Sequence, residues 1–260
     1  MKTKQRAFSV LGNLAIVNFP KGKFSVSVKK KFAQDVLKKT SATTVLEKSG
    51  KFAGRLRKMK TKHLAGKKTK EVLYKENNCV FRFNIDETYF SPRLSGERKE
   101  IASKIKKGDE VLVMFAGVAP FSIVIAKNSK AKKVYSNEIN QKANKYAKMN
   151  IERNKLKDKI ELLPGDIKRV AGKLKKKFSV IVMPRPQLKD TFLNQAFILS
   201  KSGTKIFYYD FCKQDETDSI VEKILNEAKK AKKKIKILNV KKAGEIAPYK
   251  IRCRIDFKLI

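Results

Sequence analysis

The first third of the chain consists of short apolar or alternating runs separated by turns rich in Gly, Lys and Asn. Runs of this length predict strands. The segment 32–39 has the spacing of a short helix, whereas Lys58 to Lys70, rich in lysine and glycine, predicts a loop. Residues 1–86 are therefore expected to form a small α+β domain with the helix packed on a sheet. The strand candidates are FSVLGNLAIVNF, FSVSV, TTVLEK, EVLYKE and CVFRFNI.

From about residue 90 the pattern changes, and strands alternate with helical stretches. Apolar positions recur on one face between Ile139 and Ile151, and again between Val221 and Ala228, which predicts two amphipathic helices. This alternation is typical of α/β proteins, so residues 87–260 are expected to form a mostly parallel seven-stranded sheet with helices on both faces. The strand candidates are Glu110–Phe115, Lys133–Asn137, Lys159–Leu163, Phe178–Met183, Lys205–Tyr209, Ile235–Val240 and Ile251–Leu259.

Composition adds a strong positive charge to this picture. The 260 residues include 63 Lys+Arg and 24 Asp+Glu, which gives a formal net charge of +39. A field of this size attracts polyanions, so a nucleic-acid backbone is the expected partner and a membrane surface the second choice. Most of the basic residues are lysine, and solvated lysine faces explain part of the excess.

The cysteines and the single histidine argue against several kinds of site. Cys79, Cys212 and Cys253 are far apart and form no CxxC or Cys/His pair, which argues against a zinc site or a disulfide framework. A Ser/His/Asp or Cys/His relay would rest on His63 alone, and we expect none. No stretch approaches ~18 uncharged apolar residues. The sequence therefore predicts a soluble, cytoplasmic protein without a metal site.

A turn of small residues follows the first parallel strand. Residues 115–120 read Phe-Ala-Gly-Val-Ala-Pro and let the backbone approach a ligand, which open α/β sheets bind at the carboxyl ends of their strands. Glu138 comes about 20 residues after Gly117, a spacing that places an acid to accept hydrogen bonds from ribose hydroxyls. Asp166 ends the third strand and is placed to accept from an adenine amino group.

Each of these features also has a purely structural interpretation. Residues 115–120 could equally be a tight turn without a ligand, with Glu138 as a surface acid. Asp166 could equally form an Asx turn or an N-cap of the following helix. Taken together they favour a nucleoside-containing cofactor. A dinucleotide needs a second phosphate-cradling glycine where Ala119 stands, so S-adenosylmethionine is the better fit.

The segment 89–98, YFSPRLSGER, precedes a helical stretch. In the functional interpretation Glu97 is a base, and Arg93 or Arg98 holds RNA phosphate. We expect bound RNA to bury the Glu97 carboxyl and make it more basic. In the structural interpretation, Ser followed by Pro caps the helix and the charged residues lie on its surface.

Two prolines frame Arg185 after the fourth strand, in Met183-Pro184-Arg185-Pro186-Gln187. Proline fixes the backbone and removes donors, so carbonyl groups are left at the carboxyl edge of the sheet. Such a loop suits recognition of a flat base that carries hydrogen-bond donors. The alternative is a simple turn at the entry to a helix.

Seven motifs in order resemble those of the archaeal and eukaryotic type of tRNA (guanine-37-N1)-methyltransferase, and the resemblance covers about Phe8 to Ile260. It implies a class I methyltransferase domain, an RNA-binding domain over roughly residues 1–86, S-adenosylmethionine as methyl donor, and the tRNA anticodon stem-loop as partner. A monomer that binds neither DNA nor membrane is expected. The motifs are YFSPRLSGER, VLVMFAGVAPFSI, SNEIN, LPGD, VIVMPRPQLKDTFLNQA, IFYYDF and GEIAPYKIRCRIDF.

The resemblance also implies roles for individual residues. Glu97 resembles the base that takes the guanine N1 proton, and Arg55 resembles the arginine that stabilises charge on O6, with Arg57 as a possible substitute. Pro184 and Tyr89 are expected to line the target pocket. The expected cofactor contacts are Phe115, Ala116, Gly117, Val118, Glu138, Ile139, Asp166, Ile167 and Met183, and the expected substrate contacts are Tyr89, Arg93, Arg98 and Arg185.

Two rival functions stay open from the sequence. The related aminocarboxypropyl transferases of wybutosine synthesis use the same cofactor and share most of the motifs. An RNA-binding protein with a degenerate methyltransferase fold is the other rival, because Val113 and Ala119 stand where the family commonly has Asp and Gly.

Overall fold

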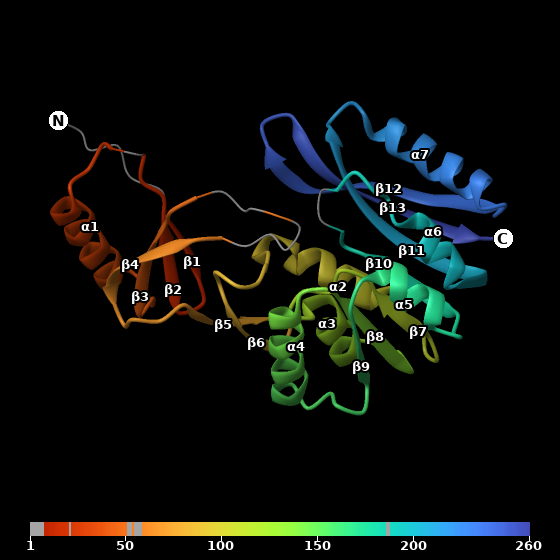
Figure 1. Cartoon of the computed structure of the whole chain (residues 1–260), viewed down its shortest axis with the longest axis horizontal. Helices are drawn as coiled ribbons and strands as arrows, with labels where there is room; N and C mark the ends of the chain where they lie inside the picture. The colour runs from red at the N-terminus through yellow and green to blue at the C-terminus, as the bar shows by residue number, and fades with distance from the viewer. Residues whose placement is uncertain (1–7, 21, 51–53, 55–58, 186–187) are drawn as a thin grey trace. The chain divides into compact units, whose positions relative to one another are not determined.

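The structure, a computed structural model, describes residues 8–20, 22–50, 54, 59–185 and 188–260. The chain divides into two units, Met1–Pro92 and Arg93–Ile260 (Figure 1). The boundary expected after residue 86 lies a few residues earlier and stays a prediction. In chain order the first unit contains β1 (Phe8–Leu11), β2 (Leu14–Val17), α1 (Val26–Lys39), β3 (Thr44–Lys48), β4 (Thr61–Gly66), β5 (Glu71–Glu76) and β6 (Cys79–Asn84).

The first unit combines a four-stranded sheet with a separate hairpin. The sheet has the order β1-β2-β3-β4, in which β2 and β3 are parallel and the other pairs antiparallel. Helix α1 buries Ala33 and Val36 in the same apolar cluster as Val17 and Val45 of the sheet. Strands β5 and β6 form the antiparallel hairpin. The predicted small α+β arrangement is therefore present.

Two element predictions for the first unit are wrong. The run FSVSV, predicted as a strand, leads into α1, because the Ser25 side chain accepts a hydrogen bond from Val28 N and caps the helix. The predicted loop between Lys58 and Lys70 contains β4, which pairs antiparallel with β3 and buries Ala65. Cross-strand pairing decides this segment, and its lysine content hides the pairing from sequence reasoning.

The second unit carries the α/β domain. From Pro92 onward the chain contains η1 (Pro92–Leu94), α2 (Ser95–Ser103), β7 (Glu110–Val113), α3 (Pro120–Asn128), β8 (Lys133–Glu138), α4 (Gln141–Arg153), β9 (Ile160–Pro164), α5 (Ile167–Lys173), β10 (Phe178–Met183), α6 (Leu193–Ile198), β11 (Ser200–Lys213), α7 (Thr217–Lys230), β12 (Ile235–Ala247) and β13 (Lys250–Leu259).

These strands form one seven-stranded sheet with the order β12-β13-β11-β10-β7-β8-β9. The five strands from β11 to β9 are parallel, while β13 pairs antiparallel with both β11 and β12. Helices α2, α3 and α4 lie on one face, and α5, α6 and α7 on the other (Figure 1). The predicted mostly parallel sheet, covered on both faces, is confirmed.

Helix α3 was not predicted, and its burial explains why. Its residues from Pro120 to Ala126 are all buried, so the segment has no polar face and no helical period. In α7 the expected apolar face holds at Ile224 and Ala228, but Leu225 is 45% exposed.

Within the described ranges, no helix combines the length and the apolar character needed to cross a lipid bilayer. Over the same residues, no group of three or more His, Cys, Asp or Glu side chains is arranged to hold a metal ion.

Candidate functional site

Four neighbouring parallel strands of the second unit, β10, β7, β8 and β9, end at the same edge of the sheet. Gly117 N donates to Glu138 Oε2 at 2.8 Å, and Asn140 N donates to Oε1 at 2.7 Å. Gly165 N donates to the main-chain oxygen of Glu138 at 2.8 Å. The structure thus brings together the three strand ends marked by Gly117, Glu138 and Asp166.

The turn after β7 has an unusual backbone. Phe115, Gly117 and Ala119 all have left-handed φ angles, of 58°, 59° and 66°. This conformation costs little for glycine but about 1–3 kcal/mol for other residues, and such strain gathers at ligand sites. Ala116 N donates to Asn137 O at 2.8 Å and so ties the turn to β8. The alanine where the family commonly has glycine therefore occupies a position whose backbone favours glycine.

The Glu138 carboxylate is held by main-chain donors in a desolvated position. Burial raises its pKa, while hydrogen bonds from the amides of Asn140, Gly117 and Ile139 act in the opposite direction. Each carboxylate oxygen has two acceptor positions, so both oxygens retain capacity for hydroxyl groups of a ligand. Asp166 Oδ1 accepts from Lys168 N at 3.0 Å, which confirms the N-cap interpretation of that residue.

The expected cofactor residues fall into two classes by exposure. The partly exposed residues lie at the strand ends, and the buried residues pack in the protein interior beneath them. Phe115 packs edge-to-face against Phe192, with ring centroids 5.0 Å apart, and forms an aromatic wall beside the turn. The partly exposed residues are Phe115, Gly117, Glu138, Ile139 and Asp166, and the buried ones are Ala116, Val118, Ile167 and Met183.

Arg185 is buried and faces the protein interior. Its Nη1 donates to Asp210 Oδ1 at 2.6 Å, and its Nη2 donates to the carbonyl oxygens of Leu188 and Asp190 at 2.5 and 2.6 Å. The guanidinium thereby fixes the chain that follows the Pro-Arg-Pro segment. The substrate contact expected of Arg185 stays a prediction, and the geometry favours an anchoring role. Pro184 is partly exposed beside it.

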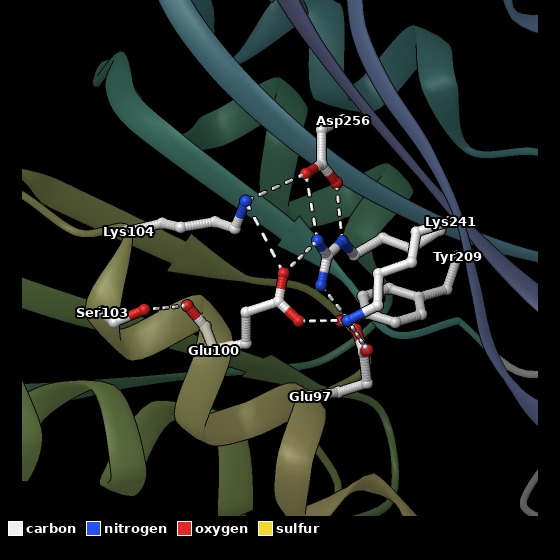
Figure 2. A network of polar contacts seen from close by, with 8 residues as sticks. Glu97, Glu100, Ser103, Lys104, Tyr209, Lys241 and Asp256 are labelled. Atoms are coloured by element: carbon white, nitrogen blue, oxygen red, sulfur yellow. Dashed lines mark hydrogen bonds and ion pairs between the residues drawn. The ribbon is translucent and has the colours of Figure 1, made fainter.

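Glu97, the expected base, lies in the first turn of α2 inside a polar network (Figure 2). Its Oε2 accepts from Arg254 Nη1 at 2.6 Å and from Tyr209 Oη at 2.8 Å. Lys241 Nζ lies 3.2 Å from its Oε1. Glu97 is only 6% exposed, so its burial comes from the protein's own strands and does not await RNA as the sequence suggested.

Arg254 is the centre of this network, and sequence reasoning missed it. Its side chain is 0% exposed, and it also donates to Glu100 Oε1 and Asp256 Oδ1, both at 2.7 Å. Burial works against its charged form, but the hydrogen bonds to Glu100 and Asp256 prevail and raise its pKa. The hydrogen bond from Arg254 lowers the pKa of Glu100 to about 2. Apolar and charged residues alternate along β13, a pattern typical of a strand with one solvated face, so the sequence offered no local signal that Arg254 is buried.

Among the residues that Figure 2 draws, the negative charges of the network equal the positive charges in number. Three carboxylates face three cations, and Lys104 completes the set with Nζ 3.6 Å from Glu100 and 3.7 Å from Asp256. The carboxylates are Glu97, Glu100 and Asp256, and the cations are Arg254, Lys241 and Lys104.

The remaining predicted residues have different surroundings. Arg93 is exposed on η1, whereas Arg98 is 1% exposed with its guanidinium 5.7 Å from the centre of an α3 phenyl ring. We therefore propose a packing role for Arg98 in place of the expected phosphate contact. Tyr89 is half-buried in the first unit. Arg55 and Arg57 lie outside the described residues.

Comparison with known proteins agrees with this geometry. A family model described as the TRM5/TYW2 methyltransferase domain matches residues 72–238, and one described as the TYW2 N-terminal domain matches residues 1–69. The Pyrococcus abyssi protein named tRNA (guanine(37)-N(1))-methyltransferase Trm5b is 31% identical over 97% of this chain and 74% of its own length.

Two solved structures are similar over nearly the whole chain. A complex of aTrm5 with tRNALeu has a TM-score of 0.84 and 29% identity, over 98% of this chain and 72% of that one. Methanocaldococcus jannaschii Trm5 in complex with adenosine has a TM-score of 0.80 and 29% identity, over 97% and 72%. The strand-end geometry, the matched domain and these relatives agree, and the chain belongs to the TRM5/TYW2 methyltransferase family.

Proposed function

We propose that this protein is a tRNA (guanine-37-N1)-methyltransferase that uses S-adenosylmethionine. The observation that carries the proposal is the contact between the strand ends at Gly117, Glu138 and Asp166, in a chain of the TRM5/TYW2 methyltransferase family. The Pyrococcus abyssi relative bears the name of this activity.

The strand ends fit an adenosine-containing donor. Both Glu138 oxygens keep acceptor capacity for ribose hydroxyls, and Asp166 is at the next strand end, where an adenine amino group would be recognised. The adenosine complex of the Methanocaldococcus jannaschii relative supports this fit. When bound, S-adenosylmethionine supplies an electrophilic methyl group on a sulfonium. The protein's part is to hold the reactants in line, which is worth ~7–11 kcal/mol in favourable cases.

Glu97 is the proposed acceptor of the guanine N1 proton, a contribution of typically ~10²–10⁴-fold in rate. It is buried, and its two oxygens lie against Arg254 and Lys241. The roles of Arg55 or Arg57 toward O6, and of Tyr89, Arg93 and Pro184 toward the target base, belong to the same proposal.

tRNA is the proposed partner. The formal net charge of +39 suits a polyanion, and the complex of the similar aTrm5 with tRNALeu supports the choice. A monomer that acts in the cytoplasm, without DNA or membrane as partner, completes the proposal.

The test is incubation of the protein with labelled S-adenosylmethionine and an unmodified tRNA transcript, followed by mass mapping of the altered nucleoside. We expect one methyl group at N1 of guanine 37. Glu97→Gln should slow single-turnover methylation by about 10²–10⁴-fold with near-normal tRNA affinity. Glu222→Gln, at an exposed position of α7, is the matched control and should retain most of the rate. A transcript that stays unmodified would refute the proposed activity. An unchanged rate in Glu97→Gln would refute the role of Glu97 as the base.

Aminocarboxypropyl transfer is the second candidate function. The match of residues 1–69 to the TYW2 N-terminal domain favours it. The leaving product decides between the two reactions, because methyl transfer releases S-adenosylhomocysteine and aminocarboxypropyl transfer releases methylthioadenosine. Calorimetric titration with S-adenosylmethionine tests the non-catalytic alternative, which predicts no binding.

A further inference from the structure

The two carboxylate oxygens of Glu97 have different surroundings (Figure 2). Buried donors from Arg254 and Tyr209 meet at Oε2, whereas Oε1 faces the half-exposed side chain of Lys241. We propose that Arg254 and Tyr209 are positioning residues that fix Oε2, so that Oε1 is the atom that takes the proton of the target base. This inference rests on the proposed function, in which Glu97 is the base.

Strand register places the three partners of Glu97 in one row. Arg254 on β13 is paired with Tyr209 on β11 and with Lys241 on β12. Side chains directly opposite each other in neighbouring strands point to the same face of a sheet. All three side chains therefore reach the face on which α2 carries Glu97, and the position of the carboxylate is set by three strands at once.

The hold on Oε2 is rigid. Arg254 is 0% exposed, and its other donors are fixed by Glu100 and Asp256, so its Nη1 has little freedom to turn. Tyr209 is fully buried as well. Burial and the neighbouring Glu97 carboxylate raise the pKa of Tyr209, so its hydroxyl keeps the proton that it donates. Two short hydrogen bonds from immobile donors hold Oε2 and thereby fix the direction in which Oε1 points.

The contact at Oε1 is of another kind. Lys241 has a side chain that is 40% exposed, and its ammonium also forms an ion pair with Glu100. Because the lysine side chain is flexible and has this second partner, it is able to leave Oε1 without becoming unpaired. Oε1 is then the oxygen open to a proton donor.

The proposed step is balanced as follows. The N1–H bond of guanine breaks, its electron pair stays on the nitrogen, and the proton forms an O–H bond with Glu97 Oε1. The nitrogen takes the methyl group, and the donor is left as S-adenosylhomocysteine. The proton passes to solvent after the modified base leaves.

Tyr209→Phe is the decisive variant, because it removes one donor to Oε2 and leaves the ring in place. Methylation is measured in single turnover at saturating S-adenosylmethionine and tRNA, and both affinities are measured separately. We expect the rate to fall about tenfold while both affinities stay within about twofold. Tyr208→Phe is the matched control, since the neighbouring hydroxyl points to Asp210 at 3.1 Å and should leave the rate within about twofold.

Arg254 provides the second measurement. Arg254→Lys keeps the cation but loses the fork that joins Glu97 to Asp256, so we expect a rate about 10- to 100-fold below wild type with unchanged affinities. In Arg254→Met, where that variant folds, the rate should be lower still, so that lysine gives partial rescue.

The outcomes separate the inference from the function on which it rests. A wild-type rate in Tyr209→Phe, or a slower rate matched by an equal loss of affinity, overturns the positioning role while Glu97→Gln still reports the base. If Glu97→Gln itself reacts at the wild-type rate, the base and the inference fail together. A wild-type protein that leaves tRNA unmethylated removes the proposed function.

Discussion

Replacement of Arg185 is informative, because the sequence predicts a substrate contact and the structure shows a buried guanidinium paired with Asp210. Arg185→Met removes a guanidinium that is buried against Asp210 and fixes the carbonyls of Leu188 and Asp190. The carboxylate would stay buried, with a Lys223 ammonium at 3.4 Å as its remaining cation. Breaking a buried ion pair costs ~3–5 kcal/mol. The half-exposed lysine places the expected loss at the lower end, about 3 kcal/mol, or about 6–12 °C in Tm.

Urea unfolding followed by circular dichroism measures this loss. Arg169→Met, at an exposed position of α5, is the matched control and should change the unfolding free energy by less than about 0.5 kcal/mol. Arg185→Met combined with Asp210→Asn should lose less than the single variant, because no uncompensated buried charge is left. Unfolding of Arg185→Met at the wild-type urea concentration, together with weaker tRNA binding, would refute the anchor and support the substrate contact.

Three further predictions concern other parts of the molecule. Glu138→Gln should weaken the binding of S-adenosylmethionine about 10- to 100-fold in calorimetry, because the glutamine amide group would face main-chain donors. Equal weakening of binding by Glu161→Gln, at an exposed position of β9, would contradict this. Since a buried guanidinium lowers the pKa of Glu100 from 4.5 to about 2, stability should fall as pH drops through that interval, and Glu100→Gln should flatten this part of the curve in acid unfolding. Gly12→Ala places a Cβ 1.9 Å from a β5 carbonyl oxygen and should cost about 1–3 kcal/mol more than Gly22→Ala, which meets nothing within 4 Å; equal urea midpoints would refute the clash.

The site at the strand ends was accessible from sequence because it depends on local signals and topology. The small-residue turn at Gly117 and the acids Glu138 and Asp166 each follow an apolar run, and parallel strands bring such positions to one edge. Glu97 was proposed from its motif. Its surroundings were not found, because Arg254 lies 157 residues away and meets it only through the register of three strands.

Local patterns also failed where tertiary pairing overrides them. The lysine-rich segment that forms β4 has few of the signals of a strand, and its pairing with β3 supplies the hydrogen bonds that settle its conformation. The fully buried α3 likewise lacks the polar face by which a helix is recognised in sequence.

The strand ends at Gly117, Glu138 and Asp166 and two of the partners of Glu97, Arg254 and Lys241, belong to different segments of the chain. The matched methyltransferase domain ends at residue 238, whereas Lys241 and Arg254 lie beyond it on the final antiparallel strands. An exchange of residues 239–260 with a relative would leave the strand ends at Gly117, Glu138 and Asp166 intact and replace Arg254 and Lys241, two of the three cations in the network around Glu97. We therefore expect variation in that hairpin to change the partners of Glu97 while the strand ends at Gly117, Glu138 and Asp166 keep their geometry.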